Sequence, residues 1–214
     1  MNLRTENRDL GAVAGGEGSI RLGLLGPFFL SLADGREVAV TTKKNRAMLA
    51  ILALSPGGQS ARERLCGLLW GDRGDEQARS SLRQSLAVLR KELGEAESLM
   101  LQVRDDMVIL RAGSLVTDAV EFLKLAEAAD PASLRQAAAL YRGELLANTY
   151  VKDAGFEEWL SAGRRRLADR AIVLFEKLTA VETGQANIDA AKRLVGLDPL
   201  REASHRALMR GFAA

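Results

Sequence analysis

Residues 75–93 carry one apolar stripe at helical spacing, and this stripe constrains the fold of the chain more than any other feature. Its leucines recur every three or four residues, as Leu82, Leu86, Leu89 and Leu93. No acidic residue lies between Arg79 and Lys91, so the rest of the helix surface offers arginine, serine and glutamine. In the major groove arginine can bind guanine, and glutamine adenine, through paired hydrogen bonds. The pattern predicts either an ordinary amphipathic helix with a solvated face or a helix that reads duplex DNA.

The positive charge of the chain is concentrated around this helix. The formal net charge over 214 residues is only +2. Residues 41–93, however, hold ten basic and five acidic residues, whereas residues 118–214 hold fourteen of each. A local excess of positive charge is expected of a segment that binds nucleic acid. The charge distribution therefore favours the DNA-reading alternative.

The segments on either side of the stripe follow the order of a winged helix, in which a strand pair precedes a helix-turn-helix and a hairpin follows it. Turn residues, cap residues and the change from alternating to helical periodicity set the expected boundaries. The expected elements are strands at 20–32 and 37–40 around an Asp34–Gly35 turn, helices at 43–54, 61–70 (with Ser60 as N-cap) and 75–93, and a hairpin at 99–117 with Asp105 and Asp106 at its tip.

From Asp118 onward only helical patterns remain. They cover about 118–129, 132–142, 156–183, 187–196 and 200–213, and the last pair is similar to a tetratricopeptide-type unit, which buries its apolar faces by stacking on neighbours. The predicted fold class is mainly α with small β-hairpins: an N-terminal winged helix-turn-helix followed by an all-α tetratricopeptide-like domain. We expect a disordered leader at 1–19, a DNA-binding domain at 20–117 and a helical domain at 118–214 that continues beyond Ala214.

Several strings of residues closely resemble one known family, the Streptomyces antibiotic regulatory protein (SARP) family. They are LLWGDR, LRQSLAVLRKELG, LYRGELL, FEEWL and LDPLREASHRALMR, and the similarity covers about residues 20–214. The resemblance implies a winged-helix DNA-binding domain of the response-regulator type, followed by a bacterial transcriptional activator domain. It also implies binding to direct-repeat promoter sites and contact with RNA polymerase.

The resemblance and the helical wheel together indicate candidate DNA contacts. Basic residues at a helix N-terminus or beside the stripe suit phosphates, whereas residues opposite the stripe suit base edges. For Arg79 a phosphate contact is the alternative, and for the lysines plain solvation is. The base-contact candidates are Arg79, Ser80, Arg83, Gln84 and Ala87, and the phosphate-contact candidates are Lys43, Lys44, Arg90, Lys91, Arg104 and Arg111.

Catalytic and cofactor sites are not expected. His205 is the one histidine and Cys66 the one cysteine, so the chain lacks a zinc-binding cluster, and it has no GxxxxGK[ST] phosphate loop. We expect a non-enzymatic protein with no metal, cofactor or small-molecule ligand. With no apolar run of bilayer length and no signal core, a cytoplasmic location is expected.

These features predict a sequence-specific DNA-binding transcriptional regulator, most simply an activator. Its expected partners are double-stranded DNA, RNA polymerase and, on DNA, a second copy of itself. Two alternatives stay open: a helical-repeat protein-interaction module in which DNA binding is weak, and the regulatory N-terminal part of a larger signalling protein.

Overall fold

Helix α3 (Asp75–Leu93) forms over the predicted residues, and the leucine stripe is its buried face. The helix ends at Gly94, whose φ of 55° is a conformation that a residue without a Cβ adopts at little cost. The computed structural model describes residues 19–96, 100–111, 113 and 115–213. The predicted leader, up to residue 18, lies outside the described residues.

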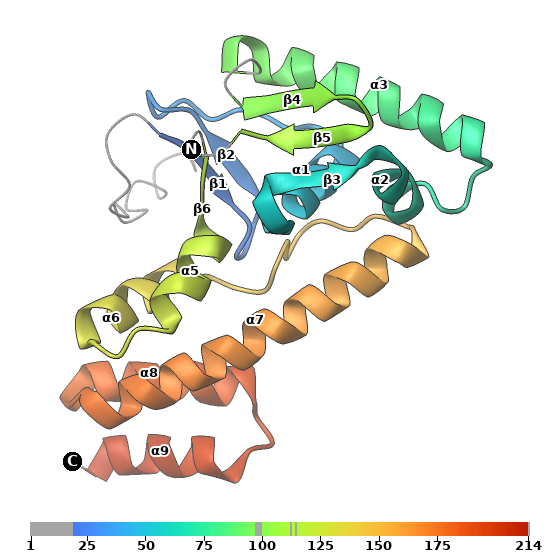
Figure 1. Ribbon diagram of the computed structural model, residues 1–214. Helices are drawn as coiled ribbons and strands as arrows, with labels where there is room; N and C mark the ends of the chain where they lie inside the picture. Colours follow the sequence, from blue (N-terminus) through green and yellow to red (C-terminus); the bar gives the residue numbers. More distant parts are fainter. Residues whose placement is uncertain (1–18, 97–99, 112, 114, 214) are drawn as a thin grey trace, which may run out of the picture.

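Two small sheets accompany this helix (Figure 1). In the first, β1 pairs antiparallel with β2 and parallel with β6, so its order is β2-β1-β6. In the second, β5 lies between β3 and β4 and is antiparallel to both. The β4–β5 pair, with Asp105 at its turn, forms only part of the hairpin predicted at 99–117, because residues 115–117 form β6 and pair with β1 instead. The strands are β1 (Ile20–Gly23), β2 (Phe29–Ser31), β3 (Gln59–Ala61), β4 (Leu101–Arg104), β5 (Met107–Leu110) and β6 (Leu115–Thr117).

Helix α1 (Lys43–Leu54) is the centre of this half of the molecule. Every residue from Ala47 to Leu52 is fully buried, and the Thr42 hydroxyl caps the helix by accepting a hydrogen bond of 3.2 Å from the Asn45 N–H. A short 3-10 turn, η1 (Pro56–Gly58), leads to β3 and then to α2 (Arg62–Leu69). Helices α1, α2 and α3 followed by the β4–β5 hairpin give the predicted winged helix-turn-helix; a second 3-10 turn, η2 (Gly94–Ala96), follows α3.

The predicted strand at 20–32 is wrong, because the chain reverses inside it. Gly26 has φ 101°, and the strands on either side pair with Gly23 opposite Phe29. Leu24 and Leu25, in the turn, are fully buried, so apolar residues continue through a bend that the sequence pattern does not reveal. The Asp34–Gly35 turn is present as predicted, with the Gly35 N–H donating to the Leu32 carbonyl at 2.9 Å. The strand predicted at 37–40 does not form: it is reduced to one β-bridge between Glu37 and Ser31.

Ser60 does not cap α2, in contrast to the prediction. It lies in the middle of β3, opposite Val108 of β5, and is buried. Helix α2 begins only at Arg62, after Ala61. Ser60 therefore pairs within the sheet and does not serve as the N-cap of α2.

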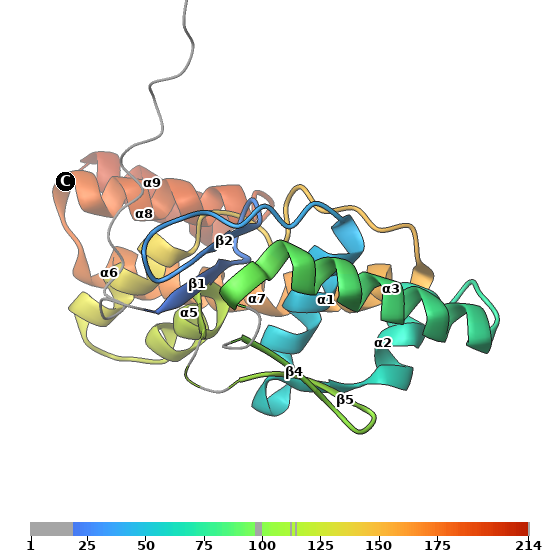
Figure 2. The same ribbon diagram turned by 90° about the horizontal axis from the view of Figure 1, so that it is seen from above.

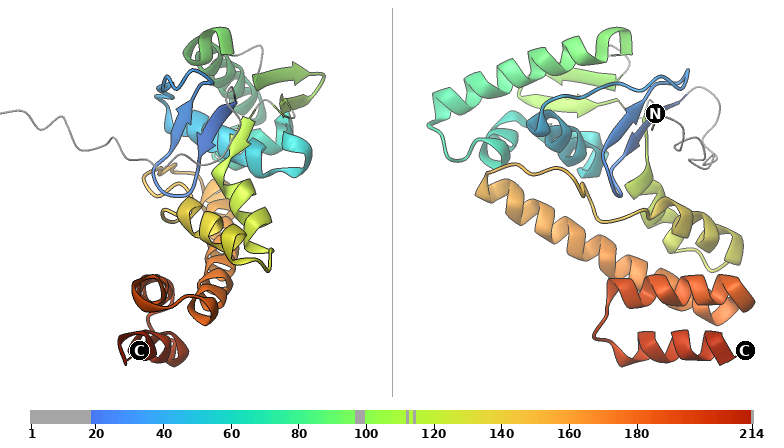
Figure 3. Two further views of the ribbon diagram at one scale, coloured as in Figure 1. Left: turned by 90° about the vertical axis from the view of Figure 1, so that its left-hand side faces the viewer. Right: turned by 180° about the vertical axis from the view of Figure 1, so that it is seen from behind.

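The second half of the chain consists of successive helices that pack in antiparallel pairs (Figure 3). Asp130 and Asp153 cap α6 and α7, accepting hydrogen bonds from Ser133 N at 2.9 Å and Gly155 N at 3.1 Å. The long helix α7 begins near α2 and ends beside α8 (Figure 1). These helices are α5 (Asp118–Ala126), α6 (Pro131–Leu140), α7 (Ala154–Val181), α8 (Gly184–Leu197) and α9 (Glu202–Ala213).

The two halves share one hydrophobic core. Its buried side chains form one cluster, whose members come from both halves of the chain, from Ile20 to Leu194. Backbone contacts reinforce the junction: Leu25 forms a β-bridge with Leu145, and the Leu146 N–H donates to the Leu24 carbonyl at 2.8 Å. The boundary at residues 117 and 118 stays a prediction, but the halves are packed together rather than strung on a linker. Within the described part of the chain, no helix has both the length and the apolarity needed to cross a membrane.

Candidate nucleic-acid interface

The outer side of α3 lies at the end of the molecule opposite α8 and α9 (Figures 1 and 3). The β4–β5 hairpin lies beside it, as Figure 2 shows from above. Because the helical half is on the far side, a long rod-shaped ligand has room to lie along α3 and the hairpin. This end of the molecule is therefore the candidate nucleic-acid interface.

The structure brings the five base-contact candidates onto this outer side. Arg79, Arg83, Gln84 and Ala87 are exposed, and Ser80 is half-buried. Arg79 forms an ion pair of 3.3 Å with Glu76, and both side chains are well exposed. Since exposed pairs of this kind contribute little free energy, the pair does not hold Arg79 away from a ligand. Within the described chain no residue hydrogen-bonds the Arg83 or Gln84 side chain.

Most phosphate-contact candidates surround the outer side of α3. Arg90 and Lys91 are exposed on its last turns, and Arg104 and Arg111 are exposed at the ends of the hairpin strands. Lys43 is exposed at the first residue of α1. All five cations can face solvent, which a phosphate contact requires.

Lys44 is the exception among the phosphate-contact candidates. Its ammonium group donates to the Leu69 carbonyl at the end of α2 and lies 4.9 Å from the centre of the Trp70 ring. Burial lowers the pKa of Lys44 below the usual lysine range. The cation is attracted to the carbonyl at the α2 C-terminus, so in this structure Lys44 contributes to the packing of α1 on α2.

A contact between the end of α3 and the start of α1 stabilises this interface, and the sequence did not predict it. The Glu92 carboxylate, near the end of α3, accepts hydrogen bonds from the hydroxyl and the N–H of Thr41, the latter at 3.0 Å. The Asn45 amide lies 3.5 Å from the same carboxylate. Glu92 therefore holds the start of α1, which carries Lys43, against the end of α3.

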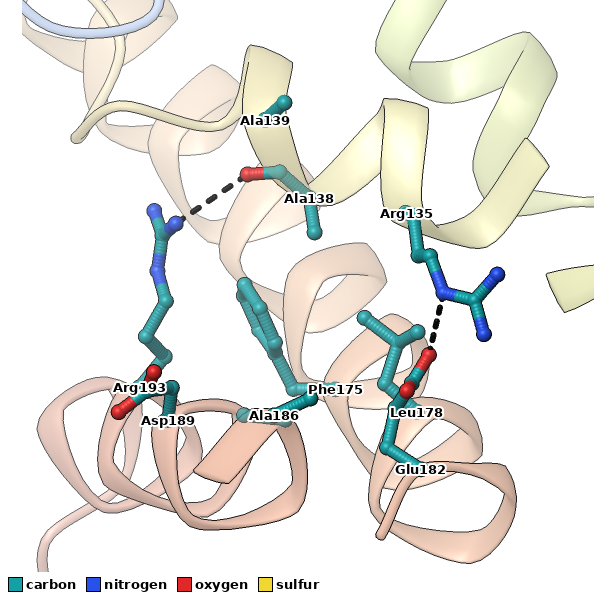
Figure 4. A pocket seen from close by; sticks show the side chains of 10 residues that line it. Arg135, Ala138, Ala139, Phe175, Leu178, Glu182, Ala186, Asp189 and Arg193 are labelled. Carbon is teal, nitrogen blue, oxygen red and sulfur yellow. Dashed lines mark hydrogen bonds and ion pairs between the residues drawn. The ribbon is translucent and has the colours of Figure 1, made fainter. Parts of the chain in front are cut away.

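Apart from this interface, a pocket lies between α6, α7 and α8, with a volume of about 240 Å³ (Figure 4). Phe175 and several alanines line it, and an Arg135–Glu182 ion pair of 2.6 Å closes one side. On the other side the Arg193 guanidinium lies 5.0 Å from the Phe175 ring centre and donates to the Ala138 carbonyl at 3.2 Å. Both arginines are engaged within the helical half, so this hollow offers a ligand little beyond apolar contact.

Other residues with chemical potential are dispersed. The described histidine, cysteine and carboxylate side chains do not assemble into any group of three or more that could hold a metal ion. Cys66 is buried, and burial raises the pKa of its thiol. His205 Nε2 lies 2.7 Å from the Pro199 carbonyl oxygen, a local contact that links α9 to the preceding turn.

Comparison with known proteins gives the same picture from a second direction. The bacterial transcriptional activator domain family matches residues 110–214. The regulatory protein AfsR of Streptomyces coelicolor is 30% identical over 211 residues, covering 90% of this chain and 20% of AfsR. The transcriptional regulatory protein MoaR1 of Mycobacterium tuberculosis is 26% identical over 216 residues, covering 91% of this chain and 67% of MoaR1. The chain thus spans about a fifth of one relative and two thirds of the other.

A solved structure shares the fold. The Mycobacterium tuberculosis protein EmbR, determined in complex with a low affinity phosphopeptide, superposes with a TM-score of 0.67 at 24% identity. The similarity covers 92% of this chain and 55% of EmbR. EmbR therefore adopts the same arrangement, a winged helix-turn-helix followed by packed helices, with a quite different sequence.

Proposed function

Because the chain belongs to the Streptomyces antibiotic regulatory protein family and carries a bacterial transcriptional activator domain, we propose that it regulates transcription by binding duplex DNA through α3. The observation that carries the proposal is the division of α3 into two sides. One side buries the leucine stripe and Ala78, and the other keeps Arg83 and Gln84 exposed. A helix presented in this way fits the width of the major groove.

We propose distinct roles for the exposed residues of the interface. Those opposite the leucine stripe approach base edges, and the cations around them contact phosphates and position the helix. Lys44 is left out of this second group because its ammonium is bound to the Leu69 carbonyl. The proposed base-contact residues are Arg79, Ser80, Arg83, Gln84 and Ala87, and the proposed phosphate-contact residues are Lys43, Arg90, Lys91, Arg104 and Arg111.

Arg83→Ala should weaken binding to the preferred duplex by about 1–3 kcal/mol and reduce discrimination at one base pair, because a bidentate base contact is lost. Lys43→Ala should instead weaken binding to all duplexes alike and lower the salt slope by roughly 1, because one phosphate contact is lost. Fluorescence anisotropy against a selected duplex and a scrambled one, over a series of salt concentrations, measures both. Equal losses on the two duplexes for Arg83→Ala would remove Arg83 from the base-contact group.

We further propose that the helical half makes the protein contacts, with RNA polymerase and with a second copy on DNA. Its support is the exposure of large apolar side chains on and beside α9, namely Leu200, Met209 and Phe212. Met209 and Phe212 are three residues apart on α9 and therefore neighbours on its surface, and exposed apolar patches often mark protein interfaces. A single α3 covers only part of a helical turn of DNA, so two copies would supply the specificity that one lacks.

Two copies should bind cooperatively to direct repeats whose centres lie about 10–10.5 bp apart, one turn of the duplex. Inserting half a turn between the repeats should remove the cooperativity, because the second copy then faces the opposite side of the DNA. Analytical ultracentrifugation on duplexes with graded spacing measures this. Cooperativity that is independent of spacing would contradict head-to-tail pairing. The affinity of one copy for a duplex with a single repeat tests DNA recognition separately.

A further inference from the structure

Val88 interrupts the polar outer side of α3. Its side chain is 42% exposed, whereas the leucines of the helix are buried. Valine is a weaker helix former than alanine or leucine because its branched Cβ restricts the side chain in a helix. Because Val88 is only partly buried, its packing within the chain offsets only part of this unfavourable helix propensity. Its methyl groups are available to a ligand that lies against α3.

The position of Val88 along the helix relates it to the proposed base contacts. Residues four before and three after a given residue lie next to it on a helix surface. For Val88 these are Gln84 and Lys91, both exposed, whereas Ser85 and Glu92, three before and four after it, are half-buried. Val88 therefore lies at one edge of the DNA-facing side, next to an amide that suits adenine and a cation that suits phosphate.

We propose that Val88 contacts the 5-methyl group of a thymine in the major groove, so that the protein prefers thymine over cytosine at that base pair. This inference depends on the proposed function. The thymine methyl is the apolar group that base pairs present in the major groove, and an apolar side chain is its matching partner. Any other base at that position would leave the valine methyls against polar base edges.

The helix geometry also indicates where this thymine lies. Gln84 and Val88 are separated by four residues, about 6 Å along the helix axis. Successive base pairs rise about 3.4 Å, so the two side chains reach base pairs one or two steps apart. If Gln84 binds an adenine, the preferred site contains that adenine and the thymine contacted by Val88 within a few base pairs.

The test begins with a preferred site selected from a random duplex pool with the full chain. Each thymine of that site is then replaced, one at a time, by deoxyuridine, which lacks only the methyl group. We expect one replacement to weaken binding about 3- to 5-fold, the value of one buried methyl group. Val88→Ala should bind the thymine and deoxyuridine duplexes equally at that position. Val173→Ala, at an equally exposed valine (43%) on α7, should retain the difference.

The outcomes separate the inference from the function on which it depends. If the chain selects no sequence and binds no duplex, the proposed function fails. If it selects a site at which no thymine methyl matters, or at which Val88→Ala keeps the same sensitivity, DNA recognition stands and the role of Val88 is overturned. Because Val88 is exposed, circular dichroism of Val88→Ala should match that of the unchanged chain.

Discussion

Asp118→Ala should lower the free energy of unfolding by about 2–4 kcal/mol, since it leaves buried donors without acceptors. Asp118 is the first residue of α5, and only 8% of it is exposed. Its carboxylate accepts hydrogen bonds from the N–H groups of Leu24 at 2.7 Å and Leu25 at 3.1 Å. Arg142 Nη2 completes the site at 2.9 Å. Burial raises the pKa of Asp118, while these three donors act to lower it.

Urea denaturation followed by circular dichroism measures this loss. The matched control is Asp34→Ala, which removes an exposed Arg36–Asp34 ion pair of 2.7 Å and an exposed hydrogen bond of 2.9 Å from the Arg36 N–H. That variant should unfold at the same urea concentration as the unchanged chain, because exposed ion pairs are weak. If Asp118→Ala also left the midpoint unchanged, the buried contacts to Leu24 and Leu25 would not be stabilising the junction.

Asp118 also explains why the two halves of the chain are coupled. Its partners lie in the turn between β1 and β2, so the start of the helical half is fixed to the N-terminal sheet. A second carboxylate acts in the same way farther along the chain: Asp153 caps α7 and also accepts a hydrogen bond of 2.9 Å from the Gly71 N–H at the end of α2. The two aspartates therefore fix the start of α5 and the start of α7 to the N-terminal half.

Neither aspartate could be assigned from the sequence. Asp118 and Leu24 are 94 residues apart, and Asp153 and Gly71 are 82 apart. Local patterns report on neighbours within a few residues, and in such a pattern each aspartate is only a suitable first residue of a helix. The same distance hides the turn at Gly26, where buried leucines continue through the bend because the helical half covers them.

The elements that local signals do define were predicted with their boundaries nearly right. α3 follows from the period of its leucines, α1 from the helical pattern at 43–54, and the β4–β5 turn from Asp105 and Asp106. A winged helix-turn-helix fold was therefore within reach of the sequence alone. Ser60 shows where local signals fail: serine is a good cap residue, but here it lies in β3 and pairs with β5.

The candidate site shows the same division. Helical periodicity correctly predicted that Arg83, Gln84 and Ala87 are exposed, because the leucine stripe fixes the orientation of α3. It did not predict that Lys44 turns toward α2, which depends on where α2 ends in space. Val88 was not among the candidates from the sequence, and its exposure in the folded chain is what distinguishes it.

Ala87→Glu should abolish measurable binding to every duplex, with a loss of at least about 100-fold. Ala87 is exposed one turn after Arg83, at the centre of the outer side of α3. A carboxylate there would meet the phosphates and the electronegative base edges of the groove, and like charges held together in an interface cost several kcal/mol. It would also pair with Arg83 and Lys91, one turn away on either side, and withdraw both cations from the DNA.

Fluorescence anisotropy with the selected and the scrambled duplex measures the loss for Ala87→Glu. Glutamate is a good helix former, so α3 itself should persist, and circular dichroism checks that it does. Ala162→Glu makes the same change at an exposed alanine of α7, far from α3, and should bind DNA as the unchanged chain does. If Ala87→Glu bound as tightly as Ala162→Glu, a surface other than α3 would have to face the DNA, since a carboxylate at the centre of a DNA-reading helix cannot be neutral in its effect.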